Sequence, residues 1–200
     1  MFLGPSARPG SLRRCVRSSL TANNGARIVP HNDMHDLAVL LVFLAAVPAA
    51  GVDSGFKTVF AKHWQVAKEF TLAVAEAMPA DSYDFKPNPE QLTFGRLMTH
   101  IGAQNSDSCA TATHTTPLPE PAVHDKTTAL KYLVDTFDKC AKDLDAVPPE
   151  LLDKEAYKFR DQPVLGYEAL WYAFTHMAHH RGQAEVYLRV KGLKPPAWQF

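Results

Sequence analysis

Two histidines one helical turn apart, His176 and His180, are the residues of this sequence best suited to bind a metal ion. Apolar residues recur around them at helical spacing over residues 166–191, and positions i and i+4 share one face of a helix. The two imidazoles can therefore converge on one cation. His179 falls to one side of the pair and need not join them.

A third ligand must come from another helix, and His100 is the candidate because it lies on the apolar side of a helix expected over residues 93–113. Three neutral imidazoles with an open fourth position are typical of a catalytic rather than a structural zinc site. The spacing therefore predicts a metal site made of His100, His176 and His180. Of the other histidines, His63 is a weaker candidate ligand, expected to be a surface or core residue.

The alternative is that these histidines bind no ion and lie at the surface or form ordinary hydrogen bonds. Phe174, Met177 and Ala184 flank the pair, and burying unpaired imidazoles among them would cost free energy, which favours a shared cation. Two other metal sites are excluded by residue type. A metalloprotease HExxH motif requires Glu where Met177 stands, and a di-iron bundle requires Glu-x-x-His pairs that neither histidine-bearing segment has.

Four amphipathic segments would position these residues, with apolar side chains at helical spacing over residues 54–78, 93–113, 125–144 and 166–191. Thr93 and Asp125 are typical N-caps, and Gly192 is a typical C-terminal stop. Prolines make residues 115–124 an extended connection, residues 150–164 are expected to form a long loop, and no strand is predicted. The pattern favours an all-α four-helix bundle.

The first 52 residues are expected to lie outside this bundle, which leaves a domain at 53–200. Residues 37–51 read LAVLLVFLAAVPAAG, which has the length of a signal-peptide core and is shorter than the ~20 residues of a spanning helix. We expect an exported protein, periplasmic or extracellular, whose signal peptide at about 34–50 is removed, with translation starting at Met34 rather than Met1. The alternatives are a cytoplasmic protein with a buried helix there, and an organellar transit peptide in the acid-free, Arg-containing residues 1–30.

Charge and composition restrict the partners. Lys+Arg and Asp+Glu each number 21, so the chain lacks the basic excess of a nucleic-acid-binding protein. No CxxC motif occurs among the three cysteines, so zinc-ribbon and thioredoxin-type sites have no support. We expect no nucleic-acid partner, no stable membrane association after signal cleavage, and a small-molecule substrate. A homodimer remains open.

Longer motifs make the chain resemble the DinB/YfiT-like superfamily over roughly residues 54–200. They are Phe85-Lys86-Pro87, then Thr93-Phe94-Gly95-Arg96-Leu97-Met98-Thr99-His100-Ile101, then His176-Met177-Ala178-His179-His180-Arg181-Gly182-Gln183 with Tyr187-Leu188-Arg189 and Gly192-Leu193-Lys194-Pro195-Pro196 after it. The resemblance implies a DinB-like bundle with a long crossover between its second and third helices. It also implies a divalent metal, zinc first or nickel, on His100, His176 and His180.

The crossover bears on two of the cysteines. If the second and third helices run parallel, Cys109 and Cys140 fall at the same end of the bundle, and an exported protein would oxidise them to a disulfide. An antiparallel hairpin would instead leave two buried free thiols.

The resemblance leaves the reaction open. Its characterised members include metal-dependent thiol S-transferases and a thiol-dependent isomerase. We therefore expect either a metal-dependent hydrolase or thiol S-transferase, with Gln104, Gln183 and Arg181 as candidate helpers, or a non-catalytic metal-binding stress or sensor module. A structural bundle with a vestigial site is the third reading. Gln183 could instead cap a polar interior, Arg181 is expected to form an ion pair inside the bundle, and His114 and His124 could line the rim of the pocket.

Overall fold

The computed structural model describes residues 54–199, and the four expected helices are all present. They are α1 (Ser54–Ala77), α2 (Phe94–Thr113), α3 (Lys126–Ala146) and α5 (Gly166–Val190). The predicted all-α bundle is therefore confirmed. The expected extension 1–52, with its signal peptide, lies outside the described residues. None of the described helices combines the length and the apolar composition that crossing a membrane requires.

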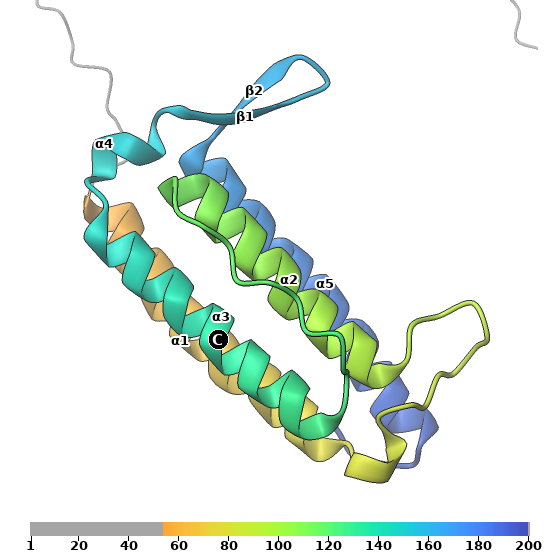
Figure 1. Ribbon diagram of the computed structural model, residues 1–200. Helices are drawn as coiled ribbons and strands as arrows, with labels where there is room; N and C mark the ends of the chain where they lie inside the picture. The colour runs from red at the N-terminus through yellow and green to blue at the C-terminus, as the bar shows by residue number, and fades with distance from the viewer. Residues whose placement is uncertain (1–53, 200) are drawn as a thin grey trace, which may run out of the picture. The chain divides into compact units, whose positions relative to one another are not determined.

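The directions of the helices follow from one long connection. In Figure 1, α1 and α5 run one way, α2 and α3 run the other way, and residues 114–125 return along the bundle between the end of α2 and the start of α3. α2 packs against both α3 and α5, and α1 packs against the same two helices. The expected crossover is confirmed, and it places α2 antiparallel to the histidine-bearing α5.

Local contacts fix where α2 begins and hold the crossover against it. The Thr93 hydroxyl accepts a hydrogen bond from the Arg96 amide at 3.2 Å, as an N-cap should. The Ser106 hydroxyl accepts one from the Leu118 amide at 2.7 Å. At Gly95 the backbone of His124 approaches so closely that any β-carbon would overlap its carbonyl oxygen. The crossover therefore has a fixed path along α2, from Ser106 back to the first turn at Gly95.

The core is formed by the apolar faces of all four long helices. Its largest fully buried side chains include Trp64, Phe70, Phe94 and Phe137. The Trp64 ring lies 4.8 Å from that of Phe137, and its indole Nε1 donates to the Phe137 carbonyl oxygen at 3.1 Å. The indole thus buries its ring without leaving its N–H unpaired.

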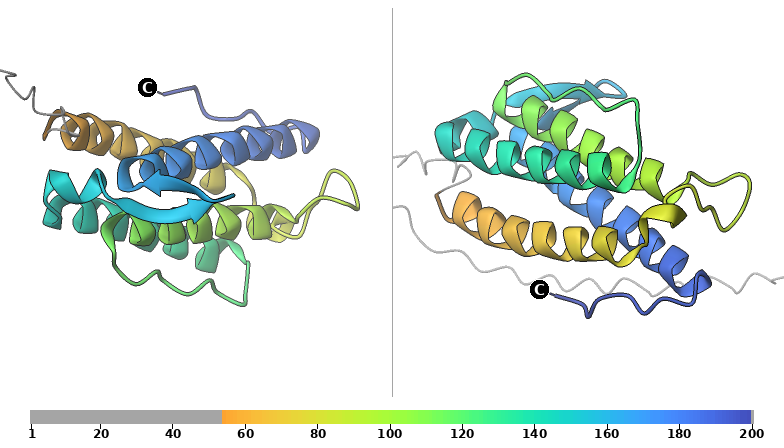
Figure 2. Two further views of the ribbon diagram at one scale, coloured as in Figure 1. Left: turned by 90° about the horizontal axis from the view of Figure 1, so that it is seen from above. Right: turned by 60° about the horizontal axis from the view of Figure 1, so that its bottom comes forward.

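The prediction of a long loop over residues 150–164 is wrong, and so is the prediction that the fold has no strand. The segment contains a short helix α4 (Pro149–Leu152) and an antiparallel hairpin of β1 (Glu155–Phe159) and β2 (Gln162–Leu165). Arg160 and Asp161, with φ of 49° and 65°, form the turn in the left-handed region without a glycine. The hairpin contacts α2 and α5 near the end of the bundle where α5 begins (Figures 1 and 2).

The parallel arrangement of α2 and α3 brings two cysteines together. The sulfur atoms of Cys109 and Cys140 lie at disulfide distance, with their α-carbons 5.4 Å apart. Each residue is only 1% exposed. This is the arrangement expected if α2 and α3 run parallel. The alternative, an antiparallel pair of helices with two buried free thiols, is not what the structure has.

Candidate metal centre

The three histidines expected to form a site come together from two antiparallel helices. His100 belongs to the first half of α2, and His176 and His180 are one turn apart near the middle of α5. One ring nitrogen from each lies within 4.8 Å of the other two, and the three residues could hold a metal ion. All three side chains are partly buried. The site thus depends on the axial register of α2 and α5.

The spacing of the rings is close to that of ligands around one ion. The ring centroid of His100 lies 5.0 Å from that of His176 and 4.8 Å from that of His180. The ring centroids of His176 and His180 are 4.3 Å apart. The Nε2 atoms of His176 and His180 are 3.1 Å apart. Two nitrogens bound tetrahedrally at ~2.0–2.1 Å from zinc would be roughly 3.3 Å apart. The pair on α5 therefore already has the spacing of two zinc ligands, and a nitrogen of His100 lies within 4.8 Å of both.

Gln183 sets the tautomer of His180. The amide oxygen of Gln183 lies 2.7 Å from Nδ1 of His180, and since this oxygen can only accept, Nδ1 carries the proton. The amide nitrogen of Gln183 in turn donates to Nε2 of His179 at 3.1 Å. Nε2 of His180 is left with its lone pair facing the other two histidines. This support resembles the hydrogen bonds that orient metal-binding histidines in general.

Burial keeps the three imidazoles neutral. It is the main cause that lowers the pKa of His176 to about 4, and the neighbouring His180, His100 and His179 lower it further. Burial also lowers the pKa of His100, helped by His180 and Arg96. For His180 burial again lowers the pKa, against the effect of the hydrogen bond that its Nδ1 donates to Gln183. At neutral pH the rings are therefore in the unprotonated form that binds a metal.

The tautomer of His176 bears on how a cation would be held. Its Nδ1 is buried and no described protein group bonds to it. An uncharged imidazole has one N–H and one lone pair, so either tautomer leaves one nitrogen of His176 without a suitable partner. A cation on Nε2 of His176 would keep the proton on Nδ1 and would take up the lone pairs of the two Nε2 atoms of His176 and His180, which lie 3.1 Å apart. The donor set therefore fits a metal, and the buried Nδ1 is not itself a ligand.

The other predicted residues lie around this site in different ways. Gln104 donates from Nε2 to the Ser108 hydroxyl at 3.0 Å and lines a pocket beside the triad. The prediction of an ion pair for Arg181 is wrong, because no ion pair between described residues includes this side chain. Its guanidinium lies over the Phe70 ring at 4.3 Å and donates to the Met177 sulfur at 3.1 Å, so aromatic and sulfur contacts replace a carboxylate.

Besides His179, three other described histidines lie outside the triad. His63 lies on α1 in an apolar groove with Phe56 and Trp171. His114 caps the far end of α2, and His124 on the crossover pairs its Nδ1 with the Thr99 hydroxyl at 2.9 Å. None of them belongs to the described group of candidate ligands.

Sequence reasoning missed Tyr172, whose ring lies 5.6 Å from that of His176. The available signal was its position four residues before His176, on the same face of α5.

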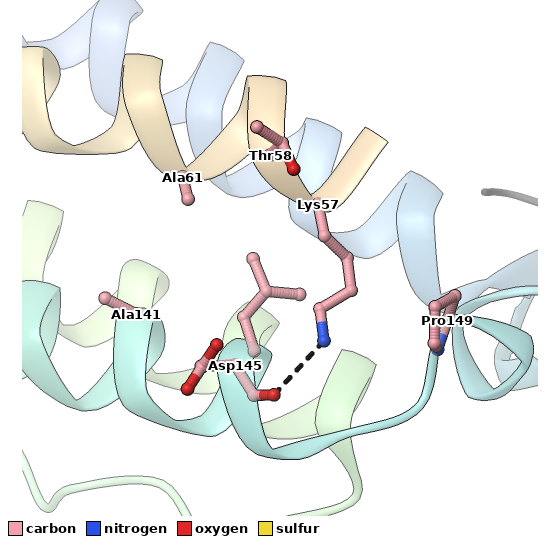
Figure 3. A pocket seen from close by; sticks show the side chains of 7 residues that line it. Lys57, Thr58, Ala61, Ala141, Asp145 and Pro149 are labelled. Carbon is pink, nitrogen blue, oxygen red and sulfur yellow. Dashed lines mark hydrogen bonds between the residues drawn. The ribbon is translucent and has the colours of Figure 1, made fainter. Parts of the chain in front are cut away.

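A pocket between α1 and α3, near the start of α1, is separate from the triad and has a structural explanation. Figure 3 shows Lys57 reaching from α1 toward the last turn of α3. Its ammonium donates to the carbonyl oxygens of Asp145 at 3.2 Å and Val147 at 2.6 Å. A cation at the C-terminal end of a helix satisfies carbonyls that lack partners there. This pocket is accordingly a helix-capping contact.

Comparison with known proteins agrees with this geometry. The sequence model of the DinB family matches residues 53–200. A DinB-like protein from Bacillus subtilis is 23% identical, with a TM-score of 0.61 over 70% of this chain and 97% of that one. A DinB-like protein from Bacillus cereus is 22% identical, with a TM-score of 0.58 over 70% and 95%. A conserved protein from Enterococcus faecalis is 20% identical, with a TM-score of 0.56 over 66% and 94%. At these identities the likeness shows the fold. No curated protein matches the sequence.

Proposed function

Since this chain belongs to the DinB family, we propose that it binds one divalent metal ion through His100, His176 and His180 and uses it to transform a small molecule. Zinc is the first choice and nickel the second. One observation carries the proposal: nitrogens from three neutral imidazoles, on two helices, lie within 4.8 Å of one another.

The reaction class follows from the number of protein ligands. Held by these three histidines, a divalent metal would lower the pKa of a water or thiol bound to it, and this would supply a nucleophile at neutral pH. Hydrolysis and thiol S-transfer are the two reactions that such a nucleophile serves. Gln183 contributes by holding His180 in the ligating tautomer, and Tyr172 contributes an aromatic wall beside His176.

Metal analysis of the purified protein tests the first half of the proposal. We expect one zinc or nickel ion per chain in the wild type and no bound ion in His100→Ala. His63→Ala is the matched control, because it removes an imidazole outside the triad and should keep the ion. A wild-type protein that takes up no ion from excess zinc or nickel would refute the metal site.

A second experiment tests for turnover. Wild type and His100→Ala are compared in a panel of hydrolysis and thiol-conjugation assays. We expect turnover in the wild type that disappears in the variant. If both are equally inert while the wild type holds its metal, the enzyme proposal fails and a non-catalytic sensor or stress module takes its place.

We further propose that the protein is exported. The support is the signal-like segment at residues 37–51 together with the buried cysteine pair at disulfide distance, which is a feature of oxidising compartments. N-terminal sequencing and thiol counting of the protein from its native cells test this. A chain found in the cytoplasm, uncleaved and with Cys109 and Cys140 reduced, would contradict it.

A further inference from the structure

A small pocket beside the triad has a composition that points to a class of ligand. It measures about 260 Å³ and lies between α2, α5 and β1, lined by Gln104, Asp107, Ser108, Thr111, Tyr157, Ala169 and Tyr172. This is somewhat below the ~300–1,000 Å³ of sites for drug-sized molecules, so it suits a small one.

The pocket begins one helical turn from the triad. Gln104 follows His100 by four residues on α2, and Tyr172 precedes His176 by four residues on α5. Because the two helices are antiparallel, both steps lead in the same direction along the bundle, by about 6 Å each. A molecule in this pocket can therefore reach the open side of the triad with its other end.

The charge of the lining has one sign. Asp107 is its ionisable acid, and no lysine, arginine or histidine is among the lining residues. No ion pair between described residues includes Asp107. Asp107 is exposed and no described ion pair neutralises it, so its carboxylate favours a cation in the pocket over a carboxylate or a phosphate.

Two tyrosines reinforce this preference. Tyr157 on the hairpin is 39% exposed and Tyr172 on α5 is 47% exposed, so their rings are accessible to a ligand in the pocket. The face of an aromatic ring attracts an ammonium group. The carboxylate and the two rings line the same pocket, and each of them favours an amine.

We infer that this pocket binds a small organic amine through Asp107, Tyr157 and Tyr172, and presents the other end of that molecule to the triad. The inference rests on the proposed function, because the bound metal would supply the reacting end of the site. The hairpin then acts as a specificity element added to the bundle, since one of the two rings comes from β1.

Three probes of similar size and different charge test the inference: phenethylamine, phenethyl alcohol and 3-phenylpropionate. Their binding is followed by NMR chemical-shift titration of the whole protein with its metal bound. We expect the amine to bind about fivefold more tightly than the alcohol, and the carboxylate more weakly than the alcohol. In Asp107→Asn the amine should fall to the affinity of the alcohol, while the alcohol is unchanged.

Control variants separate this effect from a general change of charge or folding. Asp84→Asn makes the same charge change on an exposed residue before α2 and should leave all three affinities as in the wild type. Tyr157→Phe keeps the ring face and should keep the preference for the amine. Tyr157→Leu removes the face and should weaken the amine about two- to threefold. Thermal melts establish that each variant is folded.

The outcomes distinguish this inference from the metal proposal. Equal affinities for the three probes, no binding of any probe, or an amine preference that survives in Asp107→Asn would each overturn the inference. The titration is repeated after chelation of the metal. A preference for the amine in a chain that never binds metal would support the amine pocket and refute the metal site. A chain that binds metal but shows no preference for the amine would support the metal site and refute the amine pocket.

Discussion

The two halves of α2 are joined to different neighbours by different chemistry. In its first half, His100 faces His176 and His180 of α5, and one ring nitrogen from each of the three histidines lies within 4.8 Å of the other two. In its second half, Cys109 meets Cys140 of α3, and both residues are 1% exposed. The cysteine contact is complete in itself, whereas the histidine contact lacks a component. Unsatisfied polar groups that the fold maintains are the mark of a ligand site, and saturated contacts are the mark of stability.

Removing a ligand from the histidine side should give the largest effect. In His176→Ala we expect the affinity for the metal to fall about a thousandfold, roughly 4 kcal/mol, because loss of a ligand costs more than the 10- to 100-fold loss of a supporting hydrogen bond. Competition with a chromophoric chelator measures this. His179→Ala, which alters the neighbouring ring, should change it little. Equal losses in the two variants would mean that the triad is wrongly assigned.

Removing the cysteine contact should affect stability and spare the metal. The pair closes a loop with a sequence separation of 31. In the double variant Cys109→Ala with Cys140→Ala we expect the free energy of unfolding to fall by about 3–4 kcal/mol. Urea denaturation measures the fall, and elemental analysis should still find one ion per folded chain. Loss of the metal in this variant would show that the two halves of α2 are coupled.

A smaller effect is expected where the triad depends on its support. Gln183→Ala removes the acceptor of the His180 Nδ1 proton and should weaken metal binding about 10- to 100-fold. Gln183→Glu keeps an acceptor at the same place and should restore most of the affinity. If Gln183→Ala binds metal as the wild type does, the tautomer of His180 is set by something else.

A last test is the response of the metal-free protein to pH. The pKa of His176 is about 4 in the folded chain and about 6.5 when unfolded, so between these values the unfolded state binds more protons. The free energy of unfolding should therefore be highest near neutral pH and fall as the pH drops from about 6.5 toward about 4. Urea denaturation across this range measures the slope. The slope should be shallower in His176→Ala and unchanged in the double cysteine variant; an identical slope in His176→Ala would contradict the assignment.

Much of the bundle could be predicted because its signals are local. Thr93 and Asp125 cap α2 and α3 with side-chain hydrogen bonds, as their residue types suggested. The pairing of His176 with His180 follows from helical periodicity alone. His100 was also predictable, since it lies on the core-facing side of its helix. These features require no knowledge of how distant segments meet.

The hairpin and the contacts of Arg181 could not be predicted in the same way. The strands are mostly exposed, so their side chains show no clear alternation of apolar and polar residues. Their turn uses Arg160 and Asp161 in the left-handed region instead of a glycine. The contact of Arg181 with Phe70 joins residues from α5 and α1, and only the packed structure reveals it.

Helix α1 differs from the other three long helices because it belongs to neither the cysteine pair nor the histidine triad. The disulfide joins α3 to α2, and a metal on the triad would join α5 to α2, but α1 carries no member of either group. It is held by packing and by bonds such as that from Trp64 to the Phe137 carbonyl. When the bundle opens partially, we therefore expect α1 to detach first. Its backbone amides should then exchange with deuterium while those of α2, α3 and α5 stay protected.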